Sequence, residues 1–301
     1  MNPYYKDYSE FLAEHFDGKV QKLTVDAGFT CPNRDGSLGR GGCIYCNNTS
    51  FSPTTGAKHR SVTQQLQDGK RFFSGKYPDM KYLAYFQSYT NTYAAVDDLM
   101  ALYAEALEVD DIVGIIIGTR PDCMPDELLD RLSALNREKT VIIEYGAESS
   151  HDSTLEAINR CHTWSQTVDA VLRTHKAGIP FGLHFILGLP GENRDMIMET
   201  VDRFNALPVD CVKFHQLQII NGTRLAVMYR TNPGIVTPFD VDTYVDLCAE
   251  IVNRLRDDIA IERFVSQSPD NLLIAPRWGL KNYEFTHRLH KHLEACKQMK
   301  R

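Results

Sequence analysis

Three cysteines lie close together near the start of the chain. Cys31, Cys43 and Cys46 form a C-x11-C-x2-C pattern within a glycine-rich segment, residues 28–52. Three thiolates can hold three irons of a [4Fe–4S] cluster and leave the fourth iron open, whereas electron-transfer clusters have four cysteine ligands. Glycines let backbone amides approach the cluster sulfurs, where hydrogen bonds tune the potential. An iron–sulfur cluster is therefore one interpretation of this pattern.

Two other interpretations of these thiols stay open. A structural zinc ion usually takes four ligands, and the nearby fourth ligand would be His59. Alternatively, the three cysteines are unrelated thiols. Eight cysteines in 301 residues are too few for a disulfide scaffold. The other five form no further C-x-x-C pair, which argues against a second cluster: Cys123, Cys161, Cys211, Cys248 and Cys296.

The cysteine segment follows the first of six predicted strands. The strands are predicted at residues 20–25, 82–87, 112–117, 140–145, 181–187 and 211–219. Helical patterns occupy all five connections, at residues 61–73, 96–107, 125–135, 152–159, 165–177 and 195–207. This order implies right-handed crossovers and a parallel sheet. It predicts an α/β fold and favours a partial (β/α)6 barrel over a flat doubly wound sheet. In either fold the active site lies at the carboxyl ends of the strands.

The alternation changes after Pro238. A long helix is predicted at residues 239–255, a strand at 259–265 and a final helix at 283–298. We therefore predict a core barrel over residues 1–237, which contains the cysteine segment. An α/β extension over residues 238–301 would pack on this barrel.

The composition is that of an ordinary globular protein, with 43% hydrophobic and 24% charged residues. The net charge of −6 argues against binding of nucleic acid by bulk charge, although a local basic cleft is compatible with it. The longest apolar run, residues 112–118, is far shorter than the roughly 20 residues of a membrane span. Residues 1–14 lack the apolar core of a secretory signal. We expect a cytoplasmic protein without a membrane partner.

Several segments resemble the radical S-adenosylmethionine (SAM) superfamily. The sequence GFTCPNRDGSLGRGGCIYCN is similar to the cluster loop of the branch related to the radical SAM subunit of Elongator and to oxygen-independent coproporphyrinogen oxidase. GTRPD at residues 118–122, the segment at 145–164 and HFILGLPGE at 184–192 are similar to further motifs of that branch. The resemblance implies a [4Fe–4S] cluster on the three cysteines. It also implies that SAM chelates the open iron and is cleaved to a 5′-deoxyadenosyl radical.

The resemblance also suggests which residues contact SAM. Glu148 and Arg160 occupy positions where the family contacts SAM, with the arginine pairing with the SAM carboxylate. Gly188 falls in the strand end that lines the adenine side, and His184 stands where relatives often carry an aspartate against the ribose.

The second strand departs from the family pattern. Its end lacks the Gly-Gly motif that binds the SAM amino group and reads FQSYTNTY instead. Gln87, Ser88 and Thr90 are the candidates for those contacts. Gly118 replaces the glutamate of the family's ETRPD segment, which removes a ribose or substrate contact.

A narrower resemblance covers nearly the whole chain. TCPNRDG, AYFQSYTNT, GTRPDCMPD, KFHQLQIINGT and LLIAPRW are similar to a bacterial radical SAM family of about this length, linked to wobble-uridine modification of tRNA. This implies tRNA as substrate, a flavodoxin- or ferredoxin-type reductant, and conversion of 5-carboxymethylaminomethyluridine to 5-aminomethyluridine. The C–H bond beside the amine nitrogen has no acidity useful to a side-chain base, so a carbon radical supplied by the cofactor suits this step.

Other candidate residues each have two interpretations. Lys213 and His215 alternate on one strand and share a face, where they bind a substrate carboxylate or are satisfied interior polar groups. Cys123 is a hydrogen donor or a small buried hydrophobe. Trp278 stacks on a splayed base or packs beneath its own loop. The basic residues around the cysteine segment contact RNA phosphates or form a solvated rim: Arg34, Arg40, Lys58, His59 and Arg60.

Two rival functions remain compatible with these patterns. One is a radical SAM reaction on a small metabolite or a peptide, which the net charge of −6 favours. The other is a zinc-stabilised RNA-binding module without catalysis.

Overall fold

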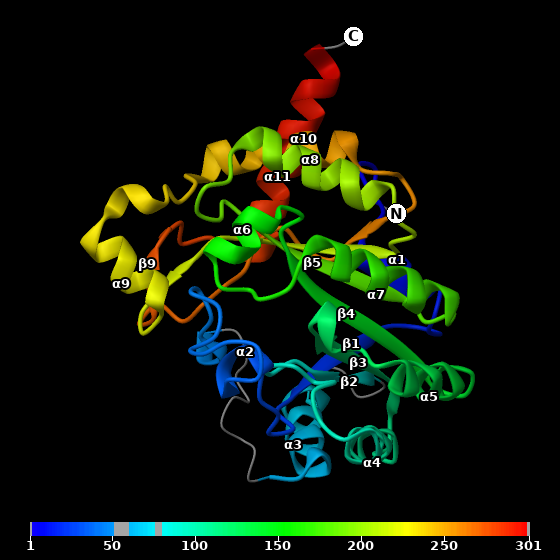
Figure 1. Ribbon diagram of the computed structural model, residues 1–301. Coiled ribbons are helices and arrows are strands. Elements are labelled where there is room, and N and C mark those ends of the chain that lie inside the picture. Colours follow the sequence, from blue (N-terminus) through cyan, green and yellow to red (C-terminus); the bar gives the residue numbers. More distant parts are fainter. Residues whose placement is uncertain (1, 51–59, 76–79, 300–301) are drawn as a thin grey trace.

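Seven parallel strands form one curled sheet, the half-barrel of Figure 1. The computed structural model describes residues 2–50, 60–75 and 80–299. The strands pair in the order β1-β2-β3-β4-β5-β6-β8, and every pairing is parallel. They are β1 (Val20–Val25), β2 (Lys81–Phe86), β3 (Ile112–Thr119), β4 (Thr140–Glu148), β5 (Phe181–Leu187), β6 (Cys211–Gln216) and β8 (Ala260–Ile261). The predicted partial barrel is confirmed.

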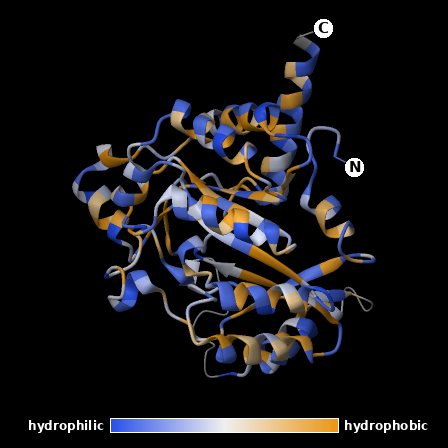
Figure 2. Ribbon diagram, turned by 45° about the vertical axis from the view of Figure 1, so that its right-hand side comes forward, coloured by the Kyte–Doolittle hydropathy of each residue, from blue (hydrophilic) through white to orange (hydrophobic). Residues whose placement is uncertain are grey.

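Helices cover the outer face of this sheet. The helices of the described residues are α1 (Tyr8–Ala13), α2 (Pro32–Asp35), α3 (Val62–Ser74), α4 (Val96–Leu107), α5 (Asp126–Asn136), α6 (Asp152–Ala157), α7 (Trp164–Lys176), α8 (Arg194–Asn205), α9 (Arg224–Thr231), α10 (Val241–Arg254) and α11 (Asn282–Met299). Of these, α3, α4, α5 and α7 pack directly against the strands of the sheet. Capping boxes fix the starts of α3 (Ser61 with Gln64) and α7 (Thr163 with Gln166). In Figure 2 the strands are largely hydrophobic, whereas the helices carry both kinds of residue, as expected for elements that bury one side.

The side chains inside the half-barrel form successive layers, because alternate residues of a strand point inward. On β4, Ile142, Glu144 and Gly146 show this progression. Ile142 belongs to an apolar layer at the amino ends of the strands, which Phe11 of α1 also fills. Glu144 lies in a charged layer above it, and Gly146 lines the cavity at the carboxyl ends. The fold therefore places polar groups directly beneath the cavity.

Two predicted strands differ from the observed ones. The prediction at residues 211–219 divides into β6 and a short β7 (Ile219–Ile220), which pairs antiparallel with β9 (Leu273–Ala275). The strand predicted at 259–265 contributes β8, which pairs with β6 and completes the barrel sheet. The sheet therefore has seven strands rather than six, because the region after residue 238 supplies its last one.

The C-terminal region packs around aromatic residues. Trp278 donates its indole N–H to the carbonyl oxygen of Phe239 at 2.9 Å and stacks on Phe285, so it takes the packed position. The two ends of the described chain meet there, with the rings of Tyr4 and His290 5.0 Å apart. Within the described ranges, every helix is too short or too polar to cross a lipid bilayer.

Candidate functional site

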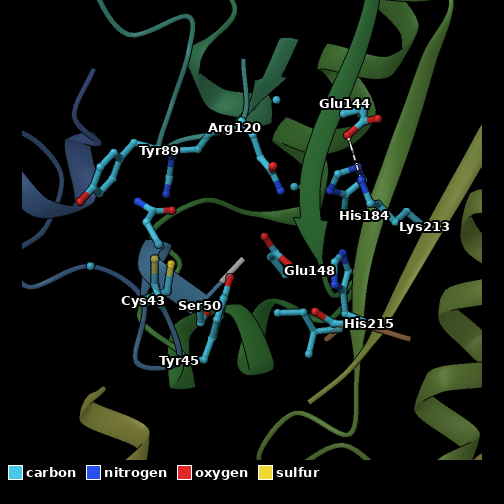
Figure 3. Close-up of a pocket in the computed structure, with 18 of the residues that line it drawn as sticks. Cys43, Tyr45, Ser50, Tyr89, Arg120, Glu144, Glu148, His184, Lys213 and His215 are labelled. Carbon is cyan, nitrogen blue, oxygen red and sulfur yellow. Dashed lines mark hydrogen bonds and ion pairs between the residues drawn. The ribbon is translucent and has the colours of Figure 1, made fainter. Parts of the chain in front are cut away.

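One cavity at the carboxyl ends of the strands brings most of the predicted site residues together (Figure 3). Cys43 lies at one end and Glu144, His184 and Lys213 lie at the other, with Glu148 between them. The predicted residues on its wall are Cys31, Cys43, Cys46, Gln87, Thr90, Glu148, Arg160, His184, Lys213 and His215. The cavity thus joins the cysteines to the interior of the barrel.

The segment that carries the cysteines is held by the two helices beside it. The backbone N–H of Ile44 donates to the carbonyl oxygen of Ile158 at 3.0 Å, just after α6. The carbonyl oxygen of Ile44 accepts from the N–H of Leu225 in α9 at 2.8 Å. The side-chain amide of Asn159 donates to the carbonyl oxygen of Gly42 at 2.8 Å. These bonds fix Cys43 and the turn that leads to Cys46, a rigidity that a metal centre requires.

The surroundings of the cysteines suit a metal centre. The Asn33 amide and the Arg160 guanidinium donate to the sulfur of Cys43, at 3.5 and 3.7 Å. Burial, with a contribution from Cys43, raises the pKa of Cys46 to about 12. The positive charge of bound metal is therefore needed to hold Cys46 as a thiolate.

The distances favour a cluster over one zinc ion. In the described part of the chain, the one set of three ligand atoms close enough for a single ion is that of Glu144, His184 and Glu262, all within 4.8 Å of one another. The three cysteine sulfurs are not such a set, whereas zinc–sulfur bonds of about 2.3 Å require tetrahedral sulfurs about 3.8 Å apart. A fourth zinc ligand at His59 and the basic residue Lys58 fall outside the described residues.

Glu148 and Arg160, the two predicted SAM contacts, face each other across the cavity wall. Glu148 has a positive φ of 68° at an irregularity in the β4 pairing, and its carboxylate lies 3.4 Å from Arg160 Nη2. The guanidinium also donates to the carbonyl oxygen of Gly146 and to His162 Nε2. A Cβ atom at Gly146 would lie 2.7 Å from both Arg160 and Glu148, so this glycine allows the pair to form. Each nitrogen of Arg160 already faces a protein partner.

Arg120 is a cavity residue that the sequence reasoning missed. Its side chain is 2% exposed and makes two parallel bonds of 2.9 Å to Asp122. Its remaining nitrogen, Nη1, is buried and has no hydrogen-bond partner in the described structure. A buried donor of this kind has room for an acceptor from a ligand. Arg120 is the arginine of the GTRPD motif, in which the sequence pattern singled out Gly118.

Three predicted site residues are not on the cavity wall. Gly188 turns toward Phe239, whose ring would lie 2.7 Å from a Cβ atom at that glycine. Cys123 lies in the segment after β3, where burial raises its pKa to about 12. Its carbonyl oxygen accepts a hydrogen bond from the Thr92 hydroxyl. Ser88 is buried between Gln87 and Tyr89, two residues that do line the cavity. SAM contacts by Gly188 and Ser88, and hydrogen donation by Cys123, stay predictions.

The charged layer beneath the cavity consists of Lys22, Glu144, Lys213 and Glu262. Lys22 lies 2.8 Å from Glu144 and 2.9 Å from Glu262. Lys213 bridges the same two carboxylates, at 3.2 and 2.9 Å. Burial raises the pKa of Glu144, but the ammonium groups of Lys213 and Lys22 outweigh it and hold this pKa well below its ordinary value. Two positive and two negative charges therefore balance.

This balance changes the interpretation of the layer. Both carboxylates of the possible ion site already carry lysine partners, so no metal ion is needed to neutralise them. Lys213 is likewise engaged with protein groups, as in its structural interpretation. His184 Nε2 lies 2.9 Å from Glu144 (Figure 3), and burial and Lys213 lower its pKa.

His215 lies above this layer on β6, on the cavity wall. Burial, and next the positive charge of Arg263, hold its pKa well below the ordinary value. The ring is therefore neutral at pH 7, and it can donate or accept one hydrogen bond but offers no charge to a substrate.

The sequence matches known family profiles over most of its length. A profile of the radical SAM superfamily matches residues 31–204, and one of the radical SAM C-terminal domain matches residues 209–295. The chain belongs to the radical SAM superfamily. The cofactors of this superfamily are a [4Fe–4S] cluster and SAM, as the sequence predicts. The zinc-stabilised module without catalysis is set aside by this membership.

Several relatives of this radical SAM protein match along most of their length. The uncharacterized protein YtqA of Bacillus subtilis is 36% identical over 96% of this chain and 89% of its own. Protein YhcC of Escherichia coli is 35% identical over 89% of this chain and 85% of its own. The structure of Elp3 from the archaeon Methanocaldococcus infernus shares the fold, with a TM-score of 0.70 at 15% identity. That alignment covers 92% of this chain and 63% of the Elp3 chain.

Proposed function

We propose that this radical SAM protein modifies tRNA in the cytoplasm, converting wobble 5-carboxymethylaminomethyluridine to 5-aminomethyluridine. The observation that carries the proposal is the single cavity that runs from the three cysteines to a polar wall on β6 and beyond β8. It lets a substrate side chain enter the barrel and meet the radical source. The five motifs that resemble the wobble-uridine family supply the identity of that side chain.

The residues at the cysteine end have binding roles in this proposal. Cys31, Cys43 and Cys46 would hold the cluster, and Arg160 stabilises the Cys43 thiolate through its hydrogen bond. When bound, the cluster and SAM supply a carbon radical able to take hydrogen from a C–H bond. The free Nη1 of Arg120 fits an oxygen of SAM. The protein must then hold the substrate C–H near contact distance, roughly 3–3.5 Å, and exclude water.

The opposite wall of the cavity is built to position a polar group. The Gln216 side chain accepts from the backbone N–H of Ser266 at 2.7 Å and donates to its carbonyl oxygen at 2.8 Å. The Ser268 hydroxyl donates to Gln218 at 2.6 Å. These contacts hold the segment after β8 against the end of β6. A rigid wall with polar side chains suits a polar, flexible uridine substituent.

Two observations support an RNA substrate. Arg34 is exposed at the cavity wall and lies over the ring of Tyr89, 5.5 Å from its centre, where a phosphate could reach it. Among weaker relatives, the tRNA uridine(34) acetyltransferase of Dehalococcoides mccartyi is 24% identical over 56% of this chain and 36% of its own. That relative is named as an enzyme of tRNA, and we extend that substrate class to this chain as part of the proposal.

Nucleoside mass spectrometry of total tRNA tests the proposal. We expect a strain without this gene to accumulate 5-carboxymethylaminomethyluridine and to lose 5-aminomethyluridine and its downstream products. The wild-type gene restores the profile, whereas a Cys43→Ala gene, made at the same protein level, does not. An unchanged nucleoside profile, in a parent that contains these modifications, refutes the tRNA substrate. A matching assay uses anaerobically purified protein, SAM, a flavodoxin-type reductant and tRNA from the deletion strain.

A small metabolite or a peptide is the second candidate substrate, and the net charge of −6 favours it. It predicts an unchanged tRNA profile together with SAM cleavage by the purified enzyme. Comparison of small-molecule extracts from the deletion strain and its parent would then identify the substrate.

A further inference from the structure

Arg263 is a cation of the cavity wall that forms no ion pair with the described residues. Arg263 follows β8, lines the cavity and has its Nε atom buried without a hydrogen-bond partner. No ion pair or side-chain hydrogen bond joins its guanidinium to any residue in ranges 2–50, 60–75 and 80–299. An arginine always carries its charge, so a buried nitrogen without an acceptor is costly unless a ligand supplies one.

Two other cations of the cavity wall already form ion pairs with protein carboxylates. Arg120 makes two bonds to Asp122, and Lys213 bridges two glutamates of the charged layer. Glu262 precedes Arg263 in sequence but is engaged by Lys22 and Lys213, both at 2.9 Å. On the part of the wall that follows β8, Arg263 is therefore a cation with capacity for an external anion.

The backbone around Arg263 is fixed. Its carbonyl oxygen accepts the N–H of Phe214 on β6 at 2.9 Å, and the N–H of Glu262 donates to Val212 at 2.8 Å. Three residues further along, the Gln216 side chain bonds to both the backbone N–H and the carbonyl oxygen of Ser266. Arg263 therefore presents its guanidinium from a rigid wall and meets an incoming anion with little loss of freedom.

We propose that Arg263 is the specificity residue that binds a carboxylate of the substrate at the end of the cavity opposite the cysteines. The planar guanidinium matches a carboxylate through two parallel N–H···O bonds. Neutral His215 beside it can add one hydrogen bond without a competing charge. The inference rests on the proposed function, in which the carboxymethylamino group carries the carboxylate. It moves the role of carboxylate binding, predicted for Lys213, to Arg263.

The test measures binding of a small carboxylate to the SAM-loaded holoenzyme by isothermal titration calorimetry. The probes are N-ethylglycine, which copies the carboxymethylamino arm, and N-ethylglycinamide, which keeps the amine but lacks the carboxylate. We expect the wild-type protein to prefer the acid, and Arg263→Gln to bind the acid about 10-fold to 100-fold more weakly with the amide unaffected, as for loss of a charge-assisted hydrogen bond. Arg263→Lys retains part of the preference because it keeps the charge without the fork.

A matched control separates this effect from general damage. Arg288→Gln removes a half-exposed arginine of α11, 3.9 Å from Asp242 and off the cavity wall, and it should bind both probes like the wild type. SAM affinity should be the same in all variants. Equal binding of acid and amide by the wild type, an undiminished preference in Arg263→Gln, or weaker SAM binding by that variant overturns the assignment.

Failure of the proposed function would look different. If wild-type enzyme leaves tRNA unchanged but prefers N-ethylglycine over its amide through Arg263, the carboxylate site stands and the tRNA substrate is wrong. If the enzyme converts tRNA and Arg263→Gln converts it with an unchanged Michaelis constant, the tRNA substrate stands and the role of Arg263 is wrong.

Discussion

Removal of the Lys213 ammonium should destabilise the protein strongly. The side chain is 4% exposed and bridges Glu144 and Glu262, so Lys213→Met leaves two buried carboxylates with Lys22 as their remaining cation. The charge of the layer changes from zero to −1. Loss of one partner from a buried ion pair costs about 3–5 kcal/mol, which is a large share of the roughly 5–15 kcal/mol that holds a domain together.

The structure also predicts which second change repairs this damage. Glu262→Gln in the Lys213→Met background returns the layer to neutrality, and we expect it to recover at least about 2 kcal/mol because no uncompensated charge remains. The free energy of unfolding is measured by urea denaturation of the apoprotein, followed by circular dichroism. Lys176→Met, on the exposed side of α7, is the control and should change it by less than about 0.5 kcal/mol.

The pH gives an independent check on the same layer. Without Lys213, the pKa values of the two glutamates rise, so acid should protonate one of them and reduce the penalty between pH 7 and pH 5. A loss below about 1 kcal/mol for Lys213→Met, or a double variant no more stable than the single one, contradicts the balanced layer.

Three further predictions concern the cavity. Cys43→Ala should reduce the iron content of anaerobically purified protein from about four per chain to nearly none, and full iron retention would exclude this ligand. Gly146→Ala should weaken SAM binding roughly tenfold, because the new methyl group would lie 2.7 Å from Arg160 Nη2 and displace it; unchanged affinity in equilibrium dialysis would contradict this. Burial, and next Arg160, lower the pKa of His162 to about 3, and that of His215 lies well below 6.5. Both rings are neutral in the folded protein but bind protons in the unfolded chain. The free energy of unfolding should therefore fall by up to about 2.7 kcal/mol per pH unit below pH 6. Urea denaturation at several pH values that shows no such slope would refute the assignment of two buried, neutral histidines.

Local patterns explain why much of the fold was predictable. The continuous apolar run of β3 and the helical spacing of α4 are signals carried by neighbouring residues, and α4 has the predicted bounds. The strand predicted at residues 259–265 contains β8, but it was assigned to the extension and not to the barrel sheet. Its place in the sheet depends on pairing with β6, which lies about 50 residues earlier in the chain. Such pairing is a tertiary effect that periodicity does not encode.

The same distinction applies to the site. The cysteines are recognisable because a cluster loop has a local spacing, and the family motifs bring Glu148 and Arg160 with it. The partners of Lys213 come from distant strands, so the sequence could not separate a substrate contact from a buried ion pair. Gly188 illustrates the reverse case, because the ring of Phe239 occupies the space that the motif alone leaves open.

The strand order bears on how the chain folds during synthesis. From β1 to β6 each strand pairs with the one made just before it, so a nascent chain can extend the sheet one βα unit at a time. The final strand, β8, and the wall that carries Arg263 are made last. Ribosome-bound chains that end near residue 237 therefore hold the cysteine segment beside an open trough. The part of the cavity wall formed by Arg263, Ser266 and Ser268 is absent at that stage, so the cavity that contains the three cysteines is completed only late in synthesis.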